Sequence, residues 1–306
     1  MGQRIATLTL NPAIDLACVA DSVRHTHKVR TRDEHIDPGG GGINVARVLH
    51  ALGGDAMALI LAGGVTGALI EDLLTEAAVP HRTIRVKGRT RISFTVYDRD
   101  AGVEYRFVPQ GPTAEAADWE AVLAAVETLE TDWLVASGSL EHGMPVDIYR
   151  QVADIAHRRG IRFVLDTSGP PLAAALGPGI AMIKPSLGEL ESLVGRRLEG
   201  EAEQEAEALA LVRAGKAGLV AVTLGEKGAF VASATGIARL PGLSAPFRSA
   251  VGAGDSFVAA MTLALARGDA PTEALKWGIA AGTAAVICAG TARLTREEVT
   301  AQRARI

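Results

Sequence analysis

Short apolar runs that recur between helix-like segments are the feature of this sequence that most restricts its fold. The runs are too short for helices and mostly apolar throughout, so they indicate strands buried on both faces of a sheet. This alternation predicts an α/β fold with a mostly parallel central sheet covered by helices on both faces. The strand-like runs are residues 5–10, 56–62, 133–138, 162–166, 181–184 and 219–225, and the helix-like segments are residues 43–52, 68–77, 114–129, 146–158 and 203–214.

The composition limits the class of protein. The 306 residues are 48% hydrophobic, which is enough for a sizeable core, and a net charge of −4 with 4% aromatic residues argues against a general nucleic-acid binder. Cys18 and Cys288 form neither a CxxC site nor a disulfide framework, which favours a reducing compartment. The first residues lack the apolar core of a signal peptide, and the uncharged runs are short and rich in glycine. We expect a cytoplasmic protein.

Two segments interrupt the alternation of strands and helices. Residues 91–108 read as a hairpin around the turn DRDAG, and residues 14–36 also read as extended chain. A small sheet without helices is a poor independent domain. We therefore expect one domain over residues 1–306, with a β lid made of residues 14–36 and 90–109, whose apolar face favours pairing with a second subunit. The alternative is a surface hairpin packed on the main domain.

The stretch AVGAGDSF (250–257) places one acid, Asp255, directly after a nearly bare backbone. The following residues have the spacing of a helix, and free N–H groups at a helix N-terminus favour phosphates and other anions. An acid repels an anion there unless it takes a proton from the group that attacks the anion. A structural helix cap is the alternative role of Asp255.

Four consecutive glycines in DPGGGGINVAR (37–47) lead into a second helix. Glycine runs lose much conformational entropy on ordering, so this run needs a reason. Close approach of a ligand to the backbone is one reason, and Asn44 would then reach the hydroxyls of a sugar. A flexible loop is the alternative.

Other candidate residues follow the predicted strands, because ligands of parallel sheets bind beyond the carboxyl ends of the strands. In KPSLGEL (184–190), Lys184 suits an anion, and Glu189 suits a hydrated Mg²⁺ near a triphosphate. The turn in VTLGEKGAF (222–230) fits either a simple hairpin or a phosphate site beside Lys227. The polar residues at the ends of the runs are Asn11, Ser137, Ser139, Asp166, Lys184 and Thr223.

Several common motifs are absent from the sequence. There is no GxxxxGK[ST], GxSxG or HExxH, and AGGVTG (62–67) only approaches the dinucleotide fingerprint, so we interpret it as helix–strand packing. His25, His27 and His35 fit a solvated lid surface better than a metal site.

Taken together and in this order, several of these motifs resemble those of the ribokinase-like (PfkB) sugar kinases, over essentially the whole chain. The resemblance implies a three-layer α/β/α fold and a β lid that often mediates dimerisation. It also implies ATP and Mg²⁺ as cofactors and frequent activation by K⁺. The matching motifs are NPAID (11–15), PGGGGINVAR (38–47), SGSL (137–140), KPSLGEL (184–190), TLGEKGA (223–229) and VGAGDSF (251–257).

By this resemblance Asp255 accepts the proton of the attacking hydroxyl, and the backbone N–H groups of Gly252, Ala253 and Gly254 hold the transferred phosphoryl group. An ordinary aspartate suffices, because phosphoryl transfer depends on positioning and charge stabilisation more than on a strong base. The resemblance assigns the sugar phosphate to Asp15, Lys28, Gly40, Gly41, Asn44, Arg91, Arg106 and Ser139. It assigns the nucleotide to Lys184, Ser186, Glu189, Thr223, Gly225, Lys227 and Gly228, with Glu189 also holding Mg²⁺ through water. It assigns K⁺ to Ser249, Val251, Ala285, Cys288 and Gly290.

The sequence departs from the family pattern at four places. Ser186 stands where the family usually has asparagine, which loses an amide donor near Mg²⁺. Cys288 stands where asparagine is common among the K⁺ positions, and GTARL (290–294) is one residue longer than usual. The stretch SGSLEHGMP (137–145) replaces the usual SGSLPPG in the substrate loop.

The unbroken glycine run most resembles the family members that phosphorylate fructose 6-phosphate. We therefore expect ATP-dependent phosphorylation of its C1 hydroxyl, giving fructose 1,6-bisphosphate and ADP. Fructose-1-phosphate kinase and tagatose-6-phosphate kinase are alternatives, because no single residue separates the three substrates. A non-catalytic sugar-phosphate sensor is an alternative of another class, against which the presence of Asp255 and of its glycines argues.

Overall fold

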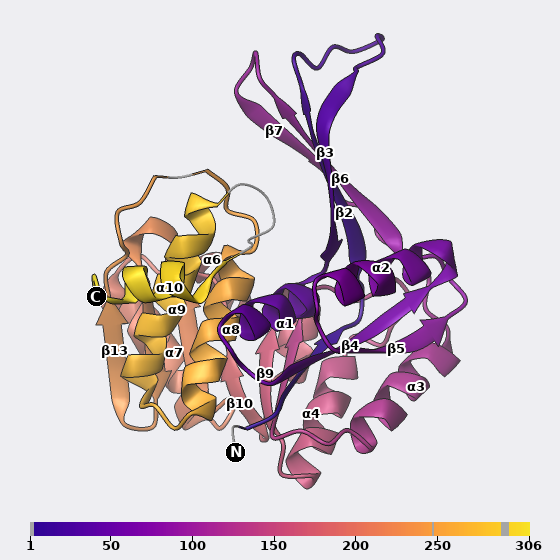
Figure 1. Ribbon diagram of the computed structural model, residues 1–306. Coiled ribbons are helices and arrows are strands. Elements are labelled where there is room, and N and C mark those ends of the chain that lie inside the picture. The colour runs from indigo at the N-terminus through magenta and orange to yellow at the C-terminus, as the bar shows by residue number, and fades with distance from the viewer. Residues whose placement is uncertain (1–2, 247, 289–293) are drawn as a thin grey trace.

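A mostly parallel sheet forms the centre of the computed structural model, which describes residues 3–246, 248–288 and 294–306 (Figure 1). Its strands follow the order β13-β12-β11-β10-β9-β8-β1-β4-β5. Neighbours from β11 to β5 pair in parallel, and β12 and β13 pair antiparallel at one edge. The strands are β1 (Ile5–Thr9), β4 (Ala56–Gly63), β5 (His81–Val86), β8 (Trp133–Ser137), β9 (Arg162–Asp166), β10 (Ile180–Ile183), β11 (Leu219–Thr223), β12 (Ala229–Ser233) and β13 (Gly236–Leu240).

Helices cover both faces of this sheet, because alternate residues of each strand point to opposite faces. In β8, Leu134 packs into the core beneath α3 to α7, whereas Val135 packs beneath α1, α8, α9 and α10. A third apolar cluster joins α1 and α2 to β4. The α/β fold with a mostly parallel sheet is therefore confirmed. The helices are α1 (Gly41–Ala51), α2 (Gly64–Glu76), α3 (Ala116–Glu127), α4 (Ile148–Arg158), α5 (Gly169–Ala175), α6 (Leu187–Val194), α7 (Glu201–Arg213), α8 (Ala253–Ala266), α9 (Pro271–Ile287) and α10 (Arg296–Arg303), with a 3₁₀ turn at Gly225–Lys227.

Every apolar run of the sequence forms a strand, but the edges of the sheet were not predicted. β5 carries His81, Arg82 and Arg85 among its residues, because an edge strand is only partly covered and needs no continuous apolar run. The turn of residues 222–230 does join an antiparallel pair, β11 and β12, as one of its two interpretations predicted. In the part of the chain that the structure describes, no helix is long and apolar enough to cross a membrane.

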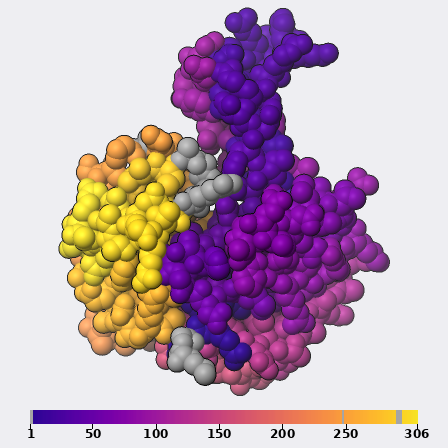
Figure 2. All heavy atoms as spheres, in the orientation of Figure 1, coloured from indigo at the N-terminus to yellow at the C-terminus, as the bar shows by residue number. Residues whose placement is uncertain are grey.

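A small sheet, made of β2 (Ala13–Ala20), β3 (Thr31–Gly39), β6 (Arg91–Asp98) and β7 (Val103–Phe107), projects away from the main body (Figures 1 and 2). Its order is β3-β2-β6-β7, with β2 and β6 parallel and the outer pairs antiparallel. The hairpin predicted for residues 91–108 is thus β6 and β7. The extended chain predicted for residues 14–36 is β2 and β3, and β3 continues into the glycine run.

The two faces of the small sheet differ in polarity. Phe94 pairs with Leu16 of β2 and with Phe107 of β7, so these side chains share one face, and the rings of Phe94 and Phe107 lie 6.4 Å apart. Phe107 is 56% exposed, which leaves this face open to solvent. The opposite face carries Asp15 and Arg106 and lines a cavity described below.

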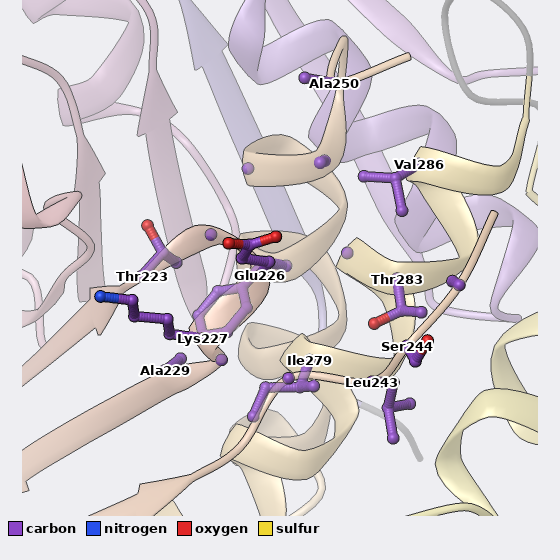
Figure 3. A pocket seen from close by; sticks show the side chains of 18 residues that line it. Thr223, Glu226, Lys227, Ala229, Leu243, Ser244, Ala250, Ile279, Thr283 and Val286 are labelled. Atoms are coloured by element: carbon purple, nitrogen blue, oxygen red, sulfur yellow. The ribbon is translucent and has the colours of Figure 1, made fainter. Parts of the chain in front are cut away.

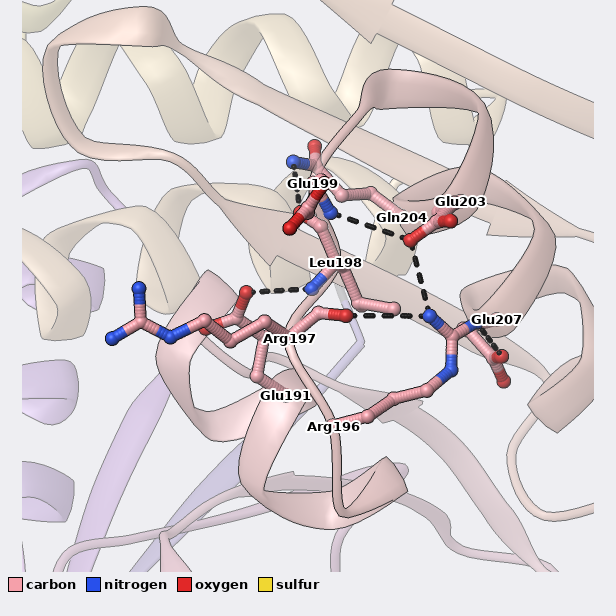
Figure 4. A network of polar contacts seen from close by, with 8 residues as sticks. All are labelled: Glu191, Arg196, Arg197, Leu198, Glu199, Glu203, Gln204 and Glu207. Atoms are coloured by element: carbon pink, nitrogen blue, oxygen red, sulfur yellow. Dashed lines mark hydrogen bonds and ion pairs between the residues drawn. The ribbon is translucent and has the colours of Figure 1, made fainter.

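A network of ion pairs and hydrogen bonds fixes α6 against α7 (Figure 4). Arg196, which follows α6, donates to the carboxylates of Glu203 at 3.0 Å and Glu207 at 2.8 Å on α7. Glu191 of α6 accepts the backbone N–H of Leu198 at 2.8 Å. A single exposed ion pair contributes little to stability. Together, however, these contacts span the short connection between α6 and α7 and fix the position of α6 relative to α7.

Glycine residues of α9 allow α8 and α9 to pack closely. A Cβ atom on Gly278 would lie 2.9 Å from the ring of Phe257, which is buried between the two helices. A Cβ atom on Gly188 of α6 would meet nothing within 4 Å. The same substitution therefore has opposite consequences at the two helical positions.

We predict that Gly278→Ala lowers the free energy of unfolding by about 1–3 kcal/mol, because the added methyl overpacks the α8–α9 contact. Gly188→Ala is the matched control and should leave stability unchanged or raise it by up to about 1 kcal/mol, through helix propensity alone. Chemical denaturation of both variants measures the difference. Equal effects would contradict the packing described for α8 and α9.

Candidate active site

Polar side chains gather where the parallel strands of the main sheet end, as the position of ligands in such sheets predicts. Ser137 ends β8, Asp166 ends β9, Lys184 follows β10 and Thr223 ends β11. Asn11, after β1, reaches across to the loop after β8, where its side chain donates to the carbonyl of Leu140 at 3.1 Å. The strand ends thus bring together residues that are far apart in the sequence.

Asp255 lies in the first turn of α8, above these strand ends. Gly252 precedes the helix with a φ of 75°, a left-handed conformation that glycine adopts without strain. The carboxylate of Asp255 accepts a hydrogen bond from Nδ2 of Asn44 at 2.9 Å and one from Oγ of Ser137 at 3.3 Å. These two donors come from α1 and β8 and not from the backbone of α8, so the carboxylate faces the strand ends, which favours a role there over that of a helix cap.

The environment of Asp255 disfavours its charge. Burial, followed by the nearby carboxylate of Asp166, raises the pKa of Asp255 to about 6, although hydrogen bonds from Asn44 and Ser137 and the charge of Lys184 act in the opposite direction. A carboxyl group with this pKa is ionised at neutral pH and still basic enough to receive a proton from a hydroxyl group that attacks a phosphoryl group.

Lys184 supplies a positive charge beside the start of α8. Its Nζ lies 3.2 Å from a carboxylate oxygen of Asp166, and a Cβ atom on Gly254 would lie 3.6 Å from Nζ. Burial disfavours the ammonium group, but the carboxylates of Asp166 and Glu189 outweigh this effect and raise the pKa of Lys184. The helix N-terminus and a permanent cation therefore face the same small space, which suits a phosphoryl group.

The glycine run packs directly onto the strand ends. A Cβ atom would lie 2.2 Å from Oγ of Ser137 if placed on Gly41, and 2.5 Å from Oγ1 of Thr9 if placed on Gly42. Gly40, with a φ of 115°, turns the chain from β3 into α1. The flexible-loop interpretation is therefore wrong, because the run is needed for close packing that places Asn44 on Asp255.

A cavity of about 490 Å³ lies between the polar face of the small sheet and the segment that precedes α8. Asp15 and Arg106 line it from the small sheet, and Arg248, Ser249 and Val251 line it from the other side. Burial raises the pKa of Asp15, although the guanidinium groups of Arg106 and Arg91 partly offset this effect. An acceptor for hydroxyl groups thus lies beside cations that suit a phosphate.

Arg91 and Ser139 lie together at one side of this region. Arg91 donates to the carbonyl oxygens of Pro109 and Asn11, both at 2.9 Å, and Asn11 donates to Oγ of Ser139 at 3.4 Å. Lys28 is elsewhere, exposed in the loop between β2 and β3 at the far end of the small sheet. The structure thus brings Arg91 and Ser139 together and separates Lys28 from them within one chain.

A second pocket, of about 920 Å³, opens on the other side of the start of α8 (Figure 3). Four of the residues predicted to bind the nucleotide line it from the end of β11 and the following turn, namely Thr223, Gly225, Lys227 and Gly228. Its other wall was not predicted and is mostly apolar, which suits a flat base. That wall comes from residues Leu243, Ser244, Ile279, Thr283 and Val286.

Ser186 and Glu189 form a capping box at the start of α6. The backbone N–H of Ser186 donates to the carboxylate of Glu189 at 2.7 Å, and Oγ of Ser186 accepts the N–H of Glu189 at 3.3 Å. Serine thus fulfils the capping role, and the charge of Glu189 still acts on Lys184. Their predicted roles toward Mg²⁺ stay predictions.

The predicted K⁺ residues that the structure describes are brought together. The N–H of Ser249 lies 3.4 Å from the carbonyl of Val286, next to Ala285 at the end of α9, and the N–H of Val251 donates to Oγ of Ser249. Cys288 follows as the C-cap of α9. Gly290, the remaining predicted residue, lies outside the described residues.

Ser137 and Asp166 lie at strand ends, as the apolar runs predict, but no motif of the sequence gives either of them a role. Ser137 donates to Asp255, and Asp166 holds Lys184 beside α8. Each is the polar residue that ends an apolar run, which predicts its position at the edge of the sheet. The hydrogen-bond and ion-pair partners of both residues could not be predicted, because they lie in segments distant in the sequence.

The combination of an acid, a helix N-terminus, a lysine and two flanking cavities defines a phosphotransferase site on a ribokinase-like fold. A family model described as pfkB family carbohydrate kinase matches residues 8–298. The chain therefore belongs to the pfkB family of carbohydrate kinases, as the sequence motifs predicted.

Relatives in sequence and structure are similar over nearly the whole chain. The ATP-dependent 6-phosphofructokinase isozyme 2 of Mycobacterium tuberculosis (strain CDC 1551 / Oshkosh) is 43% identical over 97% of this chain and 88% of the relative. The isozyme of the same name from Escherichia coli (strain K12) is 38% identical over 94% of each chain. The crystal structure of phosphofructokinase-2 from Escherichia coli in complex with potassium matches with a TM-score of 0.95 at 37% identity, covering 99% of both chains.

We predict that Asp255→Asn is more stable than the wild type at neutral pH. The folded state raises the pKa of Asp255 from 3.8 to about 6, so its ionised form opposes folding above about pH 6. Asparagine is neutral and still accepts the hydrogen bond from Asn44, so the gain should reach up to about 3 kcal/mol.

This gain should shrink as the pH falls and should vanish near the ordinary pKa of 3.8, because the wild-type carboxyl is then protonated in both states. Chemical denaturation of both proteins over this pH range measures the difference. A stability difference that does not vary with pH would contradict the environment described for Asp255.

Proposed function

We propose that this chain is an ATP-dependent 6-phosphofructokinase, which transfers the terminal phosphoryl group of ATP to the C1 hydroxyl of fructose 6-phosphate. One observation carries the proposal. Ser249 and Val251 line the cavity under the small sheet, whereas Ala253 and Gly254 line the pocket beside β11, and Asp255 is the next residue of α8. A sugar and a nucleotide bound in the two spaces would meet at the acid and at the N-terminus of the helix.

The residues around the start of α8 have roles in the transfer. The carboxylate of Asp255 receives the proton of the C1 hydroxyl as its oxygen attacks phosphorus and the bond to the departing ADP oxygen breaks. The negative charge of the phosphoryl group in the transition state is stabilised by the ammonium of Lys184 and by the backbone N–H groups of Gly252, Ala253 and Gly254. Asn44 and Ser137 keep the carboxylate oriented through their hydrogen bonds.

The sugar phosphate fits the polar face of the small sheet. We place its hydroxyl groups near Asp15, Gly40, Gly41 and Asn44, and its phosphate near Ser139 with Arg91 and Arg106. The two guanidinium groups supply the charge-assisted donors that a dianion needs. In this arrangement Arg91 and Arg106 bind the phosphorylated end of the sugar, and the C1 hydroxyl at its other end lies near Asp255.

Fructose 6-phosphate is favoured over the alternative substrates by the graded similarity to relatives. Those named 6-phosphofructokinase isozyme 2 are 43% and 38% identical to this chain. A 1-phosphofructokinase of Rhodobacter capsulatus is 34% identical, and a tagatose-6-phosphate kinase of Staphylococcus epidermidis is 29% identical. One crystal structure of the Escherichia coli neighbour is a complex with fructose-6-phosphate.

The residues present fit Mg²⁺ and K⁺. Among the described residues, no group of three or more acidic, histidine or cysteine side chains is arranged to hold a metal, and Mg²⁺ that binds mainly through triphosphate and water needs only one carboxylate, such as Glu189. K⁺ takes neutral oxygen donors, which the backbone carbonyl groups of Ser249, Val251, Ala285 and Cys288 would supply. Replacing K⁺ by Na⁺ in the assay below tests this second role.

We also propose that the small sheet is a lid that pairs with a second copy of this chain through its apolar face. The face contains Phe94 and Phe107, and paired strands place Ile92 on the same side. Exposed aromatic and branched side chains in one patch mark a contact surface. The neighbour from Escherichia coli also has a tetrameric inhibited form.

We also propose a cytoplasmic location for the protein. The free cysteines at positions 18 and 288 support this location, because cysteines stay reduced there.

The function is tested by measuring ADP release with Mg²⁺, ATP and K⁺ against fructose 6-phosphate, fructose 1-phosphate and tagatose 6-phosphate. We expect kcat/KM to be at least about tenfold higher for fructose 6-phosphate, which corresponds to about 1.4 kcal/mol of transition-state binding. A preference for another ester would overturn the assignment of fructose 6-phosphate as the substrate. Absence of turnover with all three esters would favour the alternative that the protein is a non-catalytic sugar-phosphate sensor.

Asp255→Asn is the matched control in this assay, because it removes the base while keeping the fold. It should lower kcat by about 10²–10⁴, the range for a positioned acid–base group. For the wild type, kcat/KM should fall as the pH drops through about 6, because protonated Asp255 accepts no proton. Turnover near the wild-type value in the variant would remove Asp255 from the chemistry.

The lid contact is tested by the mass of the protein in solution. We predict that the wild type has twice the mass of one 31.8 kDa chain and that Phe94→Asp has the mass of one chain, because a charge in the apolar face opposes burial. Val65→Asp is the control, since Val65 is 78% exposed on α2, outside this face. Sedimentation of the three proteins distinguishes the outcomes. Dissociation by both variants would refute the assignment of the contact.

A further inference from the structure

Glu141 is a buried carboxyl group to which the proposed reaction gives no role. It lies in the loop after β8, two residues beyond Ser139, and only 4% of its surface is exposed. Its Oε2 is buried and has no hydrogen-bond partner among the described residues. Buried carboxyl groups are normally paired, so one with an unpaired oxygen needs an explanation.

The loop of Glu141 is tied to the residues that we assign to the sugar phosphate. Asn11 donates to the carbonyl of Leu140 and to Oγ of Ser139. The backbone carbonyl of Asn11 accepts a hydrogen bond from the guanidinium group of Arg91. Within the described part of the chain, Oδ1 of Asn11 and Nε of Arg91 are also buried without a partner. Three unpaired polar atoms on neighbouring residues indicate a place that is completed by a ligand or by its water.

The charges that face Glu141 come from two elements. Arg91, at the start of β6, favours the carboxylate, and Asp118, in the first turn of α3, disfavours it. Burial is the largest influence, and together these effects raise the pKa of Glu141 to about 8. The next residue, His142, is exposed and contacts Thr113. At neutral pH the side chain is therefore a neutral acid.

Arg91 connects this acid to the substrate. Burial lowers the pKa of Arg91, while the carboxylates of Asp15 and Glu141 oppose that change, so the guanidinium lies within electrostatic reach of both. An ionised Glu141 would neutralise part of the charge that Arg91 offers to a phosphate. It would also place a negative charge in the loop that carries Ser139.

We propose that Glu141 is a positioning residue that makes binding of the sugar phosphate depend on a proton. It carries the proton while the phosphate is bound at Ser139 and Arg91, and it loses the proton at higher pH, when its carboxylate competes with the phosphate for Arg91. This inference rests on the proposed function, because it takes the phosphate of fructose 6-phosphate as the group bound there. Glu141 touches no reacting atom, so kcat is unaffected.

The sign of the effect follows from linkage. A bound dianion makes ionisation of Glu141 less favourable, so binding raises its pKa further and draws a proton from solution. If the bound form stays protonated, the Kd of fructose 6-phosphate should rise about tenfold between about pH 7 and about pH 9. The ester itself is a dianion over this range, because its second pKa is about 6. The substrate's own titration therefore adds nothing.

Calorimetric titration of fructose 6-phosphate into the wild type, in buffers of different ionisation enthalpy, tests the proposal without using activity. We expect uptake of about half a proton per site at about pH 8 and the rise in Kd stated above. Glu141→Gln mimics the neutral acid, so it should take up no proton and bind with a Kd that stays constant over the range. Glu120→Gln, on the exposed surface of α3, should behave as the wild type.

Steady-state kinetics provide a second readout that a merely structural role would not reproduce. KM for the sugar phosphate should rise with pH in the wild type and stay flat in Glu141→Gln, while kcat and KM for ATP show no difference between the two. Binding without proton uptake, or equal pH dependence in wild type and Glu141→Gln, would overturn the inference alone. Failure of fructose 6-phosphate to bind at any pH would overturn the proposed function and the inference with it.

Discussion

Close contact between the glycine run and the ends of two strands is the constraint on which the site depends. Gly41 and Gly42 lie so near Ser137 and Thr9 that a single methyl group at either position would overlap them. Only this contact allows α1 to bring Asn44 within hydrogen-bond distance of Asp255, which lies 211 positions away in the sequence. The carboxylate is thereby held by groups from β8 and α1 before any substrate arrives, which is the preorganisation that phosphoryl transfer requires.

Three carboxyl groups near the two cavities, those of Asp166, Asp255 and Glu141, have different partners. Asp166 is held by Lys184, Asp255 is held by Asn44 and Ser137, and one oxygen of Glu141 has no hydrogen-bond partner within the described part of the chain. Burial raises the pKa of all three carboxyl groups, and a nearby cation opposes this effect: Lys184 at Asp166 and Asp255, and Arg91 at Glu141. These settings suit the roles proposed above, which are a structural anchor for Asp166, a proton acceptor for Asp255 and a proton-sensitive neighbour of the phosphate site for Glu141.

Much of this arrangement could be predicted from the sequence, and the reasons for the remainder are physical. Apolar runs report burial on both faces, so the central strands and the position of the site at their ends followed directly. β5 and the apolar wall near Ile279 left no such signal, because an edge strand is half covered and a pocket wall uses ordinary core residues. The setting of Glu141 depends on Arg91 and Asp118, which approach it only in the folded chain.

The alternation of side chains in the small sheet links two surfaces that have no residue in common. In β6, Ser93 belongs to the face above the cavity and Phe94 to the apolar face. Deleting or inserting one residue within β2 or β6 would exchange the two faces beyond that point, so the proposed substrate contacts and the proposed subunit contacts would be lost together. Over evolution the lengths of these strands should therefore be fixed, whereas the turns at residues 21–30 and 99–102 are free to change in length.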